Sequence, residues 1–200
     1  MNSRTRAPLV VKIGGSLSDR FPSLVPLLIG SGRDLLLVPG GGRFADAVRE
    51  TELDDDASHW MAVAAMEQTG WSLVSHGVPP VSRLRLPKGT EVFLPYCALR
   101  DADALPHSWD VTSDTIAAWV ARFLGCDLLI LKSVDGLHAA SRLLTRIEAP
   151  VPCSEVDAGF LPYVLGHGIR TTIINGRIEE RVRAALAGVP VTGTVVHPHI

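Results

Sequence analysis

Six short apolar runs alternate along the chain with stretches of helical spacing. The runs are almost continuously hydrophobic, a pattern typical of strands covered on both faces of a parallel sheet. They lie at Leu9–Ile13, Asp34–Pro39, Glu91–Tyr96, Asp127–Val134, Thr171–Asn175 and Val191–Val196. Helices are expected at about Leu24–Ile29, Phe44–Leu53, Ala57–Ser75, Ser113–Leu124, Val156–Leu165 and Ile178–Leu186. This order predicts an α/β fold, a three-layer αβα sandwich with a mainly parallel central sheet that binds ligands at the carboxyl ends of its strands.

The composition of the chain bounds the classes of protein it can be. Its 200 residues are 46% hydrophobic and 20% charged with a net charge of −2, which predicts one domain over residues 1–200. Acidic and basic residues are interspersed, so we expect neither a nucleic acid nor a membrane as partner. The first apolar run is too short for a signal peptide or a membrane span, which predicts a cytoplasmic protein. Three widely spaced cysteines, without a metal or disulfide pattern, are expected to be reduced thiols.

Two glycine-rich turns follow the first two predicted strands. Gly14 and Gly15 stand in "KIGGS", and Gly40–Gly42 stand in "VPGGGR". Glycine lets backbone N–H groups approach an anion closely, and both turns fall at the ligand edge of the predicted sheet. One such turn is weak evidence, but two predict a phosphate-binding cleft. Neither matches the P-loop or the dinucleotide-binding fingerprint, so those two classes are not supported.

Two lysines stand at the ends of predicted strands. Lys12 lies in the first apolar run, and a strand covered on both faces rarely contains a charged residue unless the charge has a function. The alternative is a lysine whose side chain only extends past the edge of the sheet into solvent. Lys132 ends another strand and precedes a turn with Asp135 and Gly136. A cation beside glycine amides suits the transfer of a phosphoryl group, in which charge stabilisation and positioning carry most of the catalysis.

Two acidic residues lie at the start of the predicted helix Ser113–Leu124. Asp114 is in its first turn, and Asp110 is four residues earlier in the preceding loop. Acids at this position are often only partners of the helix dipole. Two acids that face a cleft with a lysine are better explained as groups that orient lysines or face magnesium.

These motifs together resemble the amino acid kinase superfamily. "VVKIGGS", "VPGGGRFAD", a D-x-x-S-D helix start, "LKSVDGL" and a closing "GTVV" occur in the order found in that superfamily, over nearly the whole chain. Its members include acetylglutamate, aspartate, uridylate and isopentenyl phosphate kinases. The resemblance implies a phosphotransferase with the amino acid kinase fold that binds Mg-ATP and an acceptor side by side and transfers the phosphoryl group directly. We also expect a homo-oligomer.

The resemblance assigns roles residue by residue. Lys12, Asp114 and Lys132 would be catalytic. Nucleotide and phosphate binding would fall to Gly14, Gly15, Ser16, Ser133, Asp135 and Gly136, and acceptor binding to Gly40, Gly41, Gly42, Arg43, Trp109, Asp110 and Asp157. Magnesium would be carried by ATP without direct protein ligands. Many members have a second catalytic lysine in a Gly-Gly-Met-x-x-Lys stretch, but the corresponding Ser154–Val182 contains none, and Lys132 is the expected replacement.

A narrower resemblance concerns the acceptor. "VD-x-x-F" at Val156–Phe160 and "NGR-x-x-ER" at Asn175–Arg181 are similar to elements of the small phosphate kinases of methanofuran-type cofactor biosynthesis, which convert an (aminomethyl)furanmethyl phosphate to its diphosphate. Such an acceptor would need arginine or glycine amides for phosphate, an aromatic face for the ring, and a carboxylate for the ammonium group. Arg43, Trp109, and Asp110 or Asp157 would offer these groups, although Trp109 could equally pack in the core.

Two other functions stay open from the sequence. One is a superfamily kinase for another small acid or phosphate, such as isopentenyl phosphate, uridylate or acetylglutamate. The other is a non-catalytic nucleotide-binding or storage subunit, because the second lysine is missing. His107 is interpreted as a hydrogen-bonded loop residue rather than a catalytic base, since a phosphate acceptor is already ionised.

Overall fold

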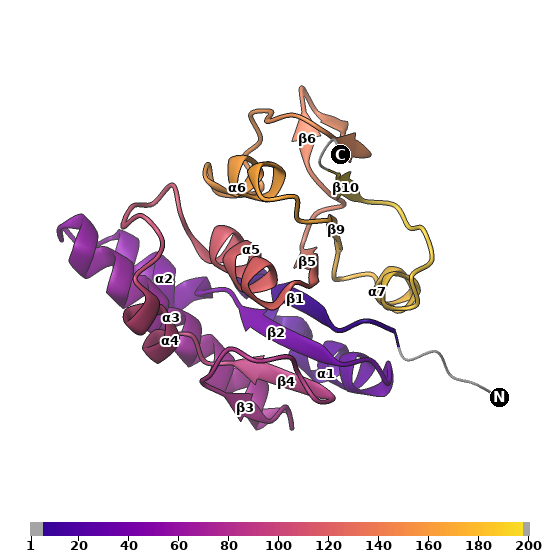
Figure 1. The fold of residues 1–200 in the computed structure, drawn as a ribbon, viewed down its shortest axis with the longest axis horizontal. Coiled ribbons are helices and arrows are strands. Elements are labelled where there is room, and N and C mark those ends of the chain that lie inside the picture. Colours follow the sequence, from indigo (N-terminus) through magenta and orange to yellow (C-terminus); the bar gives the residue numbers. More distant parts are fainter. Residues whose placement is uncertain (1–5, 198–200) are drawn as a thin grey trace.

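The computed structural model describes residues 6–197, and its centre is an eight-stranded sheet (Figure 1). Every neighbouring pair in this sheet is parallel except β9 and β10. In spatial order the strands are β3 (Pro80–Val81), β4 (Thr90–Phe93), β2 (Leu35–Pro39), β1 (Leu9–Ile13), β5 (Asp127–Lys132), β9 (Thr171–Asn175), β10 (Thr194–Val196) and β8 (Arg146–Ile147). A separate hairpin joins β6 (His138–Ala139) and β7 (Arg142–Leu143).

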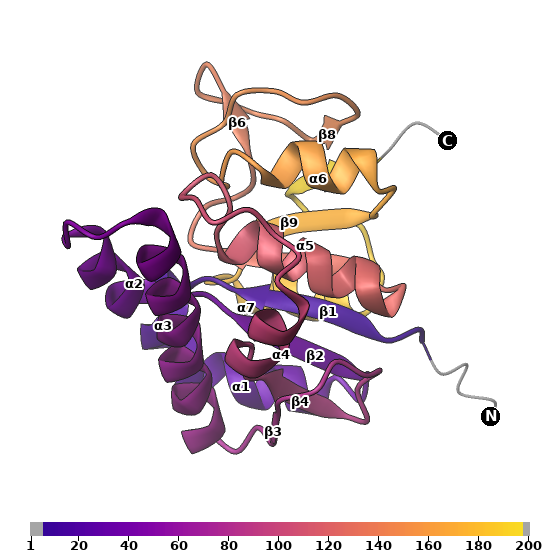
Figure 2. The same cartoon turned by 60° about the vertical axis from the view of Figure 1, so that its left-hand side comes forward.

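Helices cover both faces of the sheet (Figure 2). They are α1 (Phe21–Gly30), α2 (Gly42–Arg49), α3 (Asp55–Ser75), α4 (Tyr96–Ala102), α5 (Ser113–Leu124), α6 (Phe160–Gly166) and α7 (Glu179–Leu186), with a 3-10 helix η1 (Gly15–Arg20) after β1. One buried cluster contains side chains of α5 and α6, and the other contains those of α1 and α7. The predicted three-layer αβα sandwich with a mainly parallel sheet is therefore confirmed.

The alternation of side chains along β1 and β5 decides which layer each residue faces. Val10 packs in the cluster that contains α5, whereas its neighbours Leu9 and Val11 pack on the α1 side. Ile130 of β5 likewise packs on the α5 side. Lys12 and Lys132 follow two residues after Val10 and Ile130, so both side chains lie on the face that α5 covers.

Several element bounds differ from the prediction. The third predicted strand ends at Phe93, and the unforeseen α4 begins at Tyr96. The predicted helices at Phe44–Leu53 and Val156–Leu165 instead span Gly42–Arg49 and Phe160–Gly166. Near the end of α5, Phe123 is 62% exposed although it is apolar. The periodicity of short apolar stretches does not record where the chain must turn to reach its next partner.

Other predictions concern the chain as a whole. Cys97, Cys126 and Cys153 are free thiols, as expected. None of the helices in the described part of the chain is long and apolar enough to cross a membrane. The assignment of residues 1–200 to one domain and the cytoplasmic location stay predictions.

The amino terminus of α5 is fixed by a carboxylate from a distant segment. Asp157, just before α6, accepts hydrogen bonds at Oδ2 from the backbone N–H of Thr112 (3.0 Å) and of Thr115 (3.1 Å), and the hydroxyl groups of both threonines also donate to it. Gly159 N–H donates to the Asp110 carbonyl at 2.7 Å in the same contact. Asp157 therefore caps α5, which carries Asp114, and its carboxylate is used within the protein.

We expect Asp157→Ala to lower the free energy of unfolding by about 1–3 kcal/mol, because it removes a helix cap and leaves buried donors without an acceptor. Urea denaturation followed by circular dichroism measures this loss. The matched control is Asp110→Ala, which removes an exposed carboxylate from the adjoining loop and should cost less than about 0.5 kcal/mol. Equal losses in the two variants would contradict the capping role.

Candidate active site

Three charged side chains meet where β1, β5 and α5 converge. Lys12 Nζ lies 2.6 Å from Asp114 Oδ1, and Lys132 Nζ lies 2.8 Å from Asp114 Oδ2. Lys12 and Asp114 are each only 4% exposed. The first turn of α5 thus places one carboxylate between the ammonium groups of two neighbouring strands. The structure brings together all three residues that the sequence proposed as catalytic.

The electrostatics of this Lys12–Asp114–Lys132 triad favour an anion. Burial opposes the ionisation of Asp114, but the charges of Lys12 and Lys132 outweigh it and hold the Asp114 pKa below its usual value. Burial, and then the neighbouring charge of Lys12, lower the pKa of Lys132 although Asp114 opposes this shift. Two ammonium groups share one carboxylate, so the ionised triad carries one excess positive charge in a buried place. An anion close to it would compensate that charge.

A pocket at the carboxyl ends of β1 and β5 opens onto the triad. Among the residues predicted for catalysis or nucleotide binding, Lys12, Lys132, Gly14, Gly15, Ser16 and Ser133 line it, together with Val134 and Glu155. We call it the phosphate pocket. Gly14 N–H is already used, since it donates to the Leu131 carbonyl at 3.1 Å. The amides of Gly15 and Ser16, at the start of η1, have no acceptor within their own helix.

Two residues predicted to bind the nucleotide have other surroundings. Asp135 accepts hydrogen bonds from Asn175 at 3.0 Å and from Arg181 at 2.7 Å, and these donors lower its pKa. Gly136 is buried against β10, where a Cβ atom would lie 2.5 Å from Thr194 Oγ1. Neither lines the phosphate pocket. An ion pair and close packing account for these residue types, and their assignment to the nucleotide stays a prediction.

The two glycine-rich turns touch each other. A Cβ atom on Gly15 would lie 2.2 Å from the Cα atom of Gly42, which has a φ of +53°. Gly40 is buried, and its N–H donates to the Ile13 carbonyl at 2.8 Å. The turns therefore form a shared wall, with the phosphate pocket on one side and a second pocket on the other.

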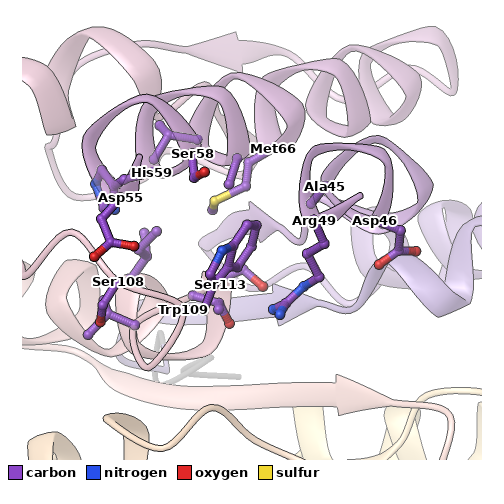
Figure 3. Close-up of a pocket in the computed structure, with 17 residues that line it drawn as sticks. Ala45, Asp46, Arg49, Asp55, Ser58, His59, Met66, Ser108, Trp109 and Ser113 are labelled. Carbon is purple, nitrogen blue, oxygen red and sulfur yellow. The ribbon is translucent and has the colours of Figure 1, made fainter. Parts of the chain in front are cut away.

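This second pocket lies between α2, α3 and the loop that leads into α5 (Figure 3). We call it the acceptor pocket. Its polar or aromatic lining comprises Asp46, Arg49, Asp55, Ser58, His59, Ser108, Trp109, Thr112 and Ser113, and its apolar lining includes Ala45, Ala62, Val63, Met66, Val111 and Ile116. The guanidinium of Arg49 lies 3.9 Å from the centre of the Trp109 ring. The pocket therefore offers a cation, carboxylates and an aromatic face within one apolar cavity.

Only some of the residues predicted to bind the acceptor line the acceptor pocket. Gly41, Gly42 and Trp109 line the acceptor pocket, and Gly40 is buried in the same glycine turn. Three others do not line it. Arg43 lies 5.0 Å from the Phe44 ring, Asp110 is exposed in the loop, and Asp157 caps α5.

Sequence reasoning missed the residues that α2 and α3 contribute to the acceptor pocket. Asp46, Arg49, Asp55 and His59 lie in "FADAVRETELDDDASHW", where charged residues at helical spacing are typical of a solvated helix face. Only the packing of α2 and α3 around the second glycine turn shows that this face lines a pocket. Thr69 in α3 contributes to that packing by donating a hydrogen bond to the Gly41 carbonyl at 3.2 Å.

Comparison with solved structures identifies the fold, whereas no family model matches the sequence. Uridylate kinase from Archaeoglobus fulgidus has a TM-score of 0.71 and 17% identity, covering 96% of this chain and 100% of its own. UMP kinase from Ureaplasma parvum has a TM-score of 0.72 and 17% identity, with 96% and 99% covered. An isopentenyl phosphate kinase has a TM-score of 0.61 and 18% identity, with 94% and 99% covered. The chain thus has the amino acid kinase fold.

A comparison with curated proteins adds a relative at higher identity. The chain is 27% identical over 200 residues to (5-(aminomethyl)furan-3-yl)methyl phosphate kinase of Methanocaldococcus jannaschii, and the match covers 90% of this chain and 93% of that protein. The relative and the solved neighbours are all kinases of small molecules. The predicted resemblance to the amino acid kinase superfamily and the predicted class, a phosphotransferase, are confirmed.

We expect Asp114→Asn to lower the free energy of unfolding by about 3–5 kcal/mol near neutral pH, because it leaves the buried ammonium group of Lys12 and the half-buried one of Lys132 without their carboxylate. The lowered pKa of Asp114 gives the sign of the pH dependence. Its contribution is present above the ordinary value of 3.8 and is lost as the pH falls through the lowered pKa, so the stabilities of variant and wild type should converge in acid. Denaturant unfolding at several pH values measures this.

The matched control is the double variant Asp114→Asn/Lys132→Met, which keeps the amide and removes one ammonium group. It should recover a large part of the stability that Asp114→Asn loses. A double variant no more stable than Asp114→Asn would show that repulsion between the lysines is not the cause of the loss.

Proposed function

We propose that the protein transfers the γ-phosphoryl group of ATP to the phosphate of a small acceptor, an (aminomethyl)furanmethyl phosphate, and so forms its diphosphate. An acceptor phosphate oxygen attacks the γ-phosphorus, a new P–O bond forms, and the bond to the bridging oxygen breaks to release ADP. The excess positive charge of the Lys12–Asp114–Lys132 triad, beside a wall shared by two pockets, is the observation that carries this proposal.

The triad suits phosphoryl transfer between two bound anions. Lys12 and Lys132 both line the phosphate pocket, so their ammonium groups can meet the charge on the transferring phosphoryl group. Asp114 contacts both ammonium groups and holds them in fixed positions before the substrates arrive. In this proposal Lys132 takes the place of the second lysine that is absent from Ser154–Val182. An ionised acceptor phosphate needs no general base, and the triad supplies none.

ATP and magnesium enter the proposal through the chemistry of the phosphate pocket. Its amides and lysines suit the phosphates of a nucleotide. Within residues 6–197 no group of three or more His, Cys, Asp or Glu side chains is arranged to hold a metal ion. In this proposal magnesium arrives on the nucleotide, where its part is to neutralise phosphate charge. ATP dependence, the acceptor and homo-oligomeric assembly are all parts of this proposal.

The lining of the acceptor pocket supports an acceptor that joins a phosphate, a ring and an ammonium group. The Gly41–Gly42 turn lies beside the phosphate pocket, and Trp109 offers a flat face that Arg49 stacks against. Asp157 caps α5 and Asp110 does not line the pocket, so this proposal gives the contact with the acceptor's ammonium group to another carboxylate. Asp46 and Arg49 lie on one side of Trp109 in Figure 3, and Asp55 lies on the other with His59 and Ser108. We assign ammonium recognition to Asp55, the carboxylate away from Arg49.

We expect Lys12→Met to lower single-turnover phosphoryl transfer by about 10²–10³, the effect of removing one preorganised charge-stabilising group, while ATP affinity falls much less. Methionine keeps the buried stem and deletes the charge. Rapid-quench measurements on Lys12→Met beside Lys132→Met compare the two lysines. Transfer by Lys12→Met near the wild-type rate would contradict the kinase mechanism, and a comparable loss in Lys132→Met would support its role as replacement.

We expect Asp55→Asn to lower kcat/KM for the amine-bearing acceptor by about 10–100-fold, since a hydrogen bond to a charged group contributes roughly 1.5–3 kcal/mol. Activity with the des-amino analogue should change little. A coupled assay of ADP release measures both acceptors, with Asp46→Asn as the matched carboxylate control and with UMP and isopentenyl phosphate as competing acceptors. If Asp55→Asn prefers the amine-bearing acceptor as strongly as wild type does, Asp55 does not recognise the ammonium group. If the protein turns over only UMP or only isopentenyl phosphate, that compound replaces the proposed acceptor.

A further inference from the structure

His107 joins α3, the end of α4 and the loop that leads into α5. It lies in the loop between α4 and α5, and both of its ring nitrogens face carboxylates. Nδ1 lies 2.7 Å from Asp56 Oδ1 in the first turn of α3, and Nε2 lies 2.9 Å from Asp103 Oδ1 at the end of α4. A neutral imidazole carries one N–H, so it could donate to only one of these oxygens. Hydrogen bonds to both carboxylates require the doubly protonated, positively charged ring.

The face of the His107 ring contacts a second histidine. His59 of α3 is stacked on it, with ring centres 4.2 Å apart and planes 18° apart, and Trp60 meets it edge-on at 5.1 Å. Burial and the charge of His107 lower the pKa of His59. The charged and titratable groups that face His107 are therefore Asp56 and His59 of α3 and Asp103 of α4. The guanidinium of Arg100, also in α4, lies 5.0 Å from the centre of the Trp60 ring, which in turn contacts His107.

Two of these three elements, α3 and the loop, also line the acceptor pocket. His59, Asp55 and Ser58 of α3 line it on one side. Residues directly after His107 also line it, namely Ser108, Trp109, Val111 and Thr112. Asp103, which begins the loop, has a φ of 40°, a left-handed conformation unusual for a residue with a side chain. His107 is thus the point at which the loop wall is attached to the α3 wall.

We infer that His107 is a positioning residue whose bridge between Asp56 and Asp103 holds the 104–112 loop against α3 and so keeps the acceptor pocket in its binding shape. The identity of the ligand in this pocket rests on the proposed function, but the bridge itself does not. His107 lines neither pocket, so its effect on the acceptor passes through Ser108 and Trp109. Loss of the bridge should therefore change acceptor affinity rather than the rate of transfer.

The bridge has a defined pH dependence. The hydrogen bond to Asp56, and then that to Asp103, raise the pKa of His107 above its ordinary value, although partial burial opposes them. For a raised pKa, the stabilisation is fully present below the unfolded value of about 6.5 and is lost as the pH rises through the folded value. Asp56 and Asp103 are largely exposed, with 82% and 61% of their side chains accessible. Salt should therefore weaken the bridge as well.

The test compares wild type with His107→Gln, whose amide keeps hydrogen-bonding capacity but no charge. KM for the acceptor and kcat are measured from about pH 5.5 to 9 at saturating ATP. Titration of the acceptor itself cancels in the ratio of the two enzymes at each pH. We expect KM to be about three- to tenfold higher in the variant at low pH, the range of one or two exposed ion pairs. The ratio should approach one at high pH, with kcat unchanged.

Two further variants control for effects that come from misfolding of His107→Gln rather than from loss of the bridge. His167→Gln alters an exposed histidine after α6 and should keep the wild-type pH profile. Asp103→Asn retains His107 but removes one carboxylate, so the rise in KM should move to lower pH. Carbon-13 NMR titration of the His107 ring in the same variants measures its pKa directly. The inference is wrong if His107→Gln has the wild-type KM at every pH, or if the variant loses kcat while KM stays the same.

A second readout needs no acceptor turnover. Hydrogen-exchange protection of residues 103–112, expressed relative to the unstructured rate at each pH, should fall in wild type as the pH rises through the His107 pKa. Protection should be independent of this titration in His107→Gln. If no phosphate acceptor is turned over but this pattern appears, the proposed function fails and the bridge stands. If protection is the same in both proteins at every pH, the bridge fails whatever the activity.

Discussion

The contact of one buried carboxylate with a buried and a half-buried ammonium group is the constraint on which the rest of the site depends. Asp114 is ionised because Lys12 and Lys132 oppose the cost of its burial. The contact also requires that β1, β5 and the first turn of α5 reach one point, and Asp157 caps that turn from the segment before α6. Helix capping and charge placement are therefore parts of one arrangement, and the excess positive charge of the triad follows from it.

Two pockets meet at this arrangement because the two glycine turns are in contact. The distance of 2.2 Å between a Cβ built on Gly15 and the Gly42 Cα atom leaves no room for a side chain. The wall between the pockets is thus only backbone thick, which suits direct transfer between two bound phosphates. On the far side of the acceptor pocket, the loop after His107 and the start of α3 complete the cavity. Strand ends supply the phosphate pocket, whereas helices and a loop supply most of the lining of the acceptor pocket.

Local signals in the sequence predicted those parts whose physical cause is local. The bounds of α5 were predicted because an apolar helical face ends at Gly125, which has a φ of +64°. Lys12 and Lys132 were predicted to be functional because a charged residue at the end of a buried strand is rare unless the charge has a function. α4 was missed because its seven residues lie directly after β4 and a proline. Asp110 and Asp157 were predicted to bind the acceptor because carboxylates suit an ammonium group. Their packing shows that the residue type does not decide which way the side chain points.

The sequence by itself determined the layered fold, the two glycine turns and the pair of strand-end lysines, because apolar periodicity and side-chain alternation act over a few residues. Only the tertiary structure decided that Lys12 and Lys132 share Asp114, that Asp157 is a cap, and that Asp55, His59 and Arg49 surround a pocket. The 45 residues between Asp157 and Thr112 illustrate the reason. Contacts between residues so far apart in the chain depend on how whole helices pack, and no local pattern records that packing.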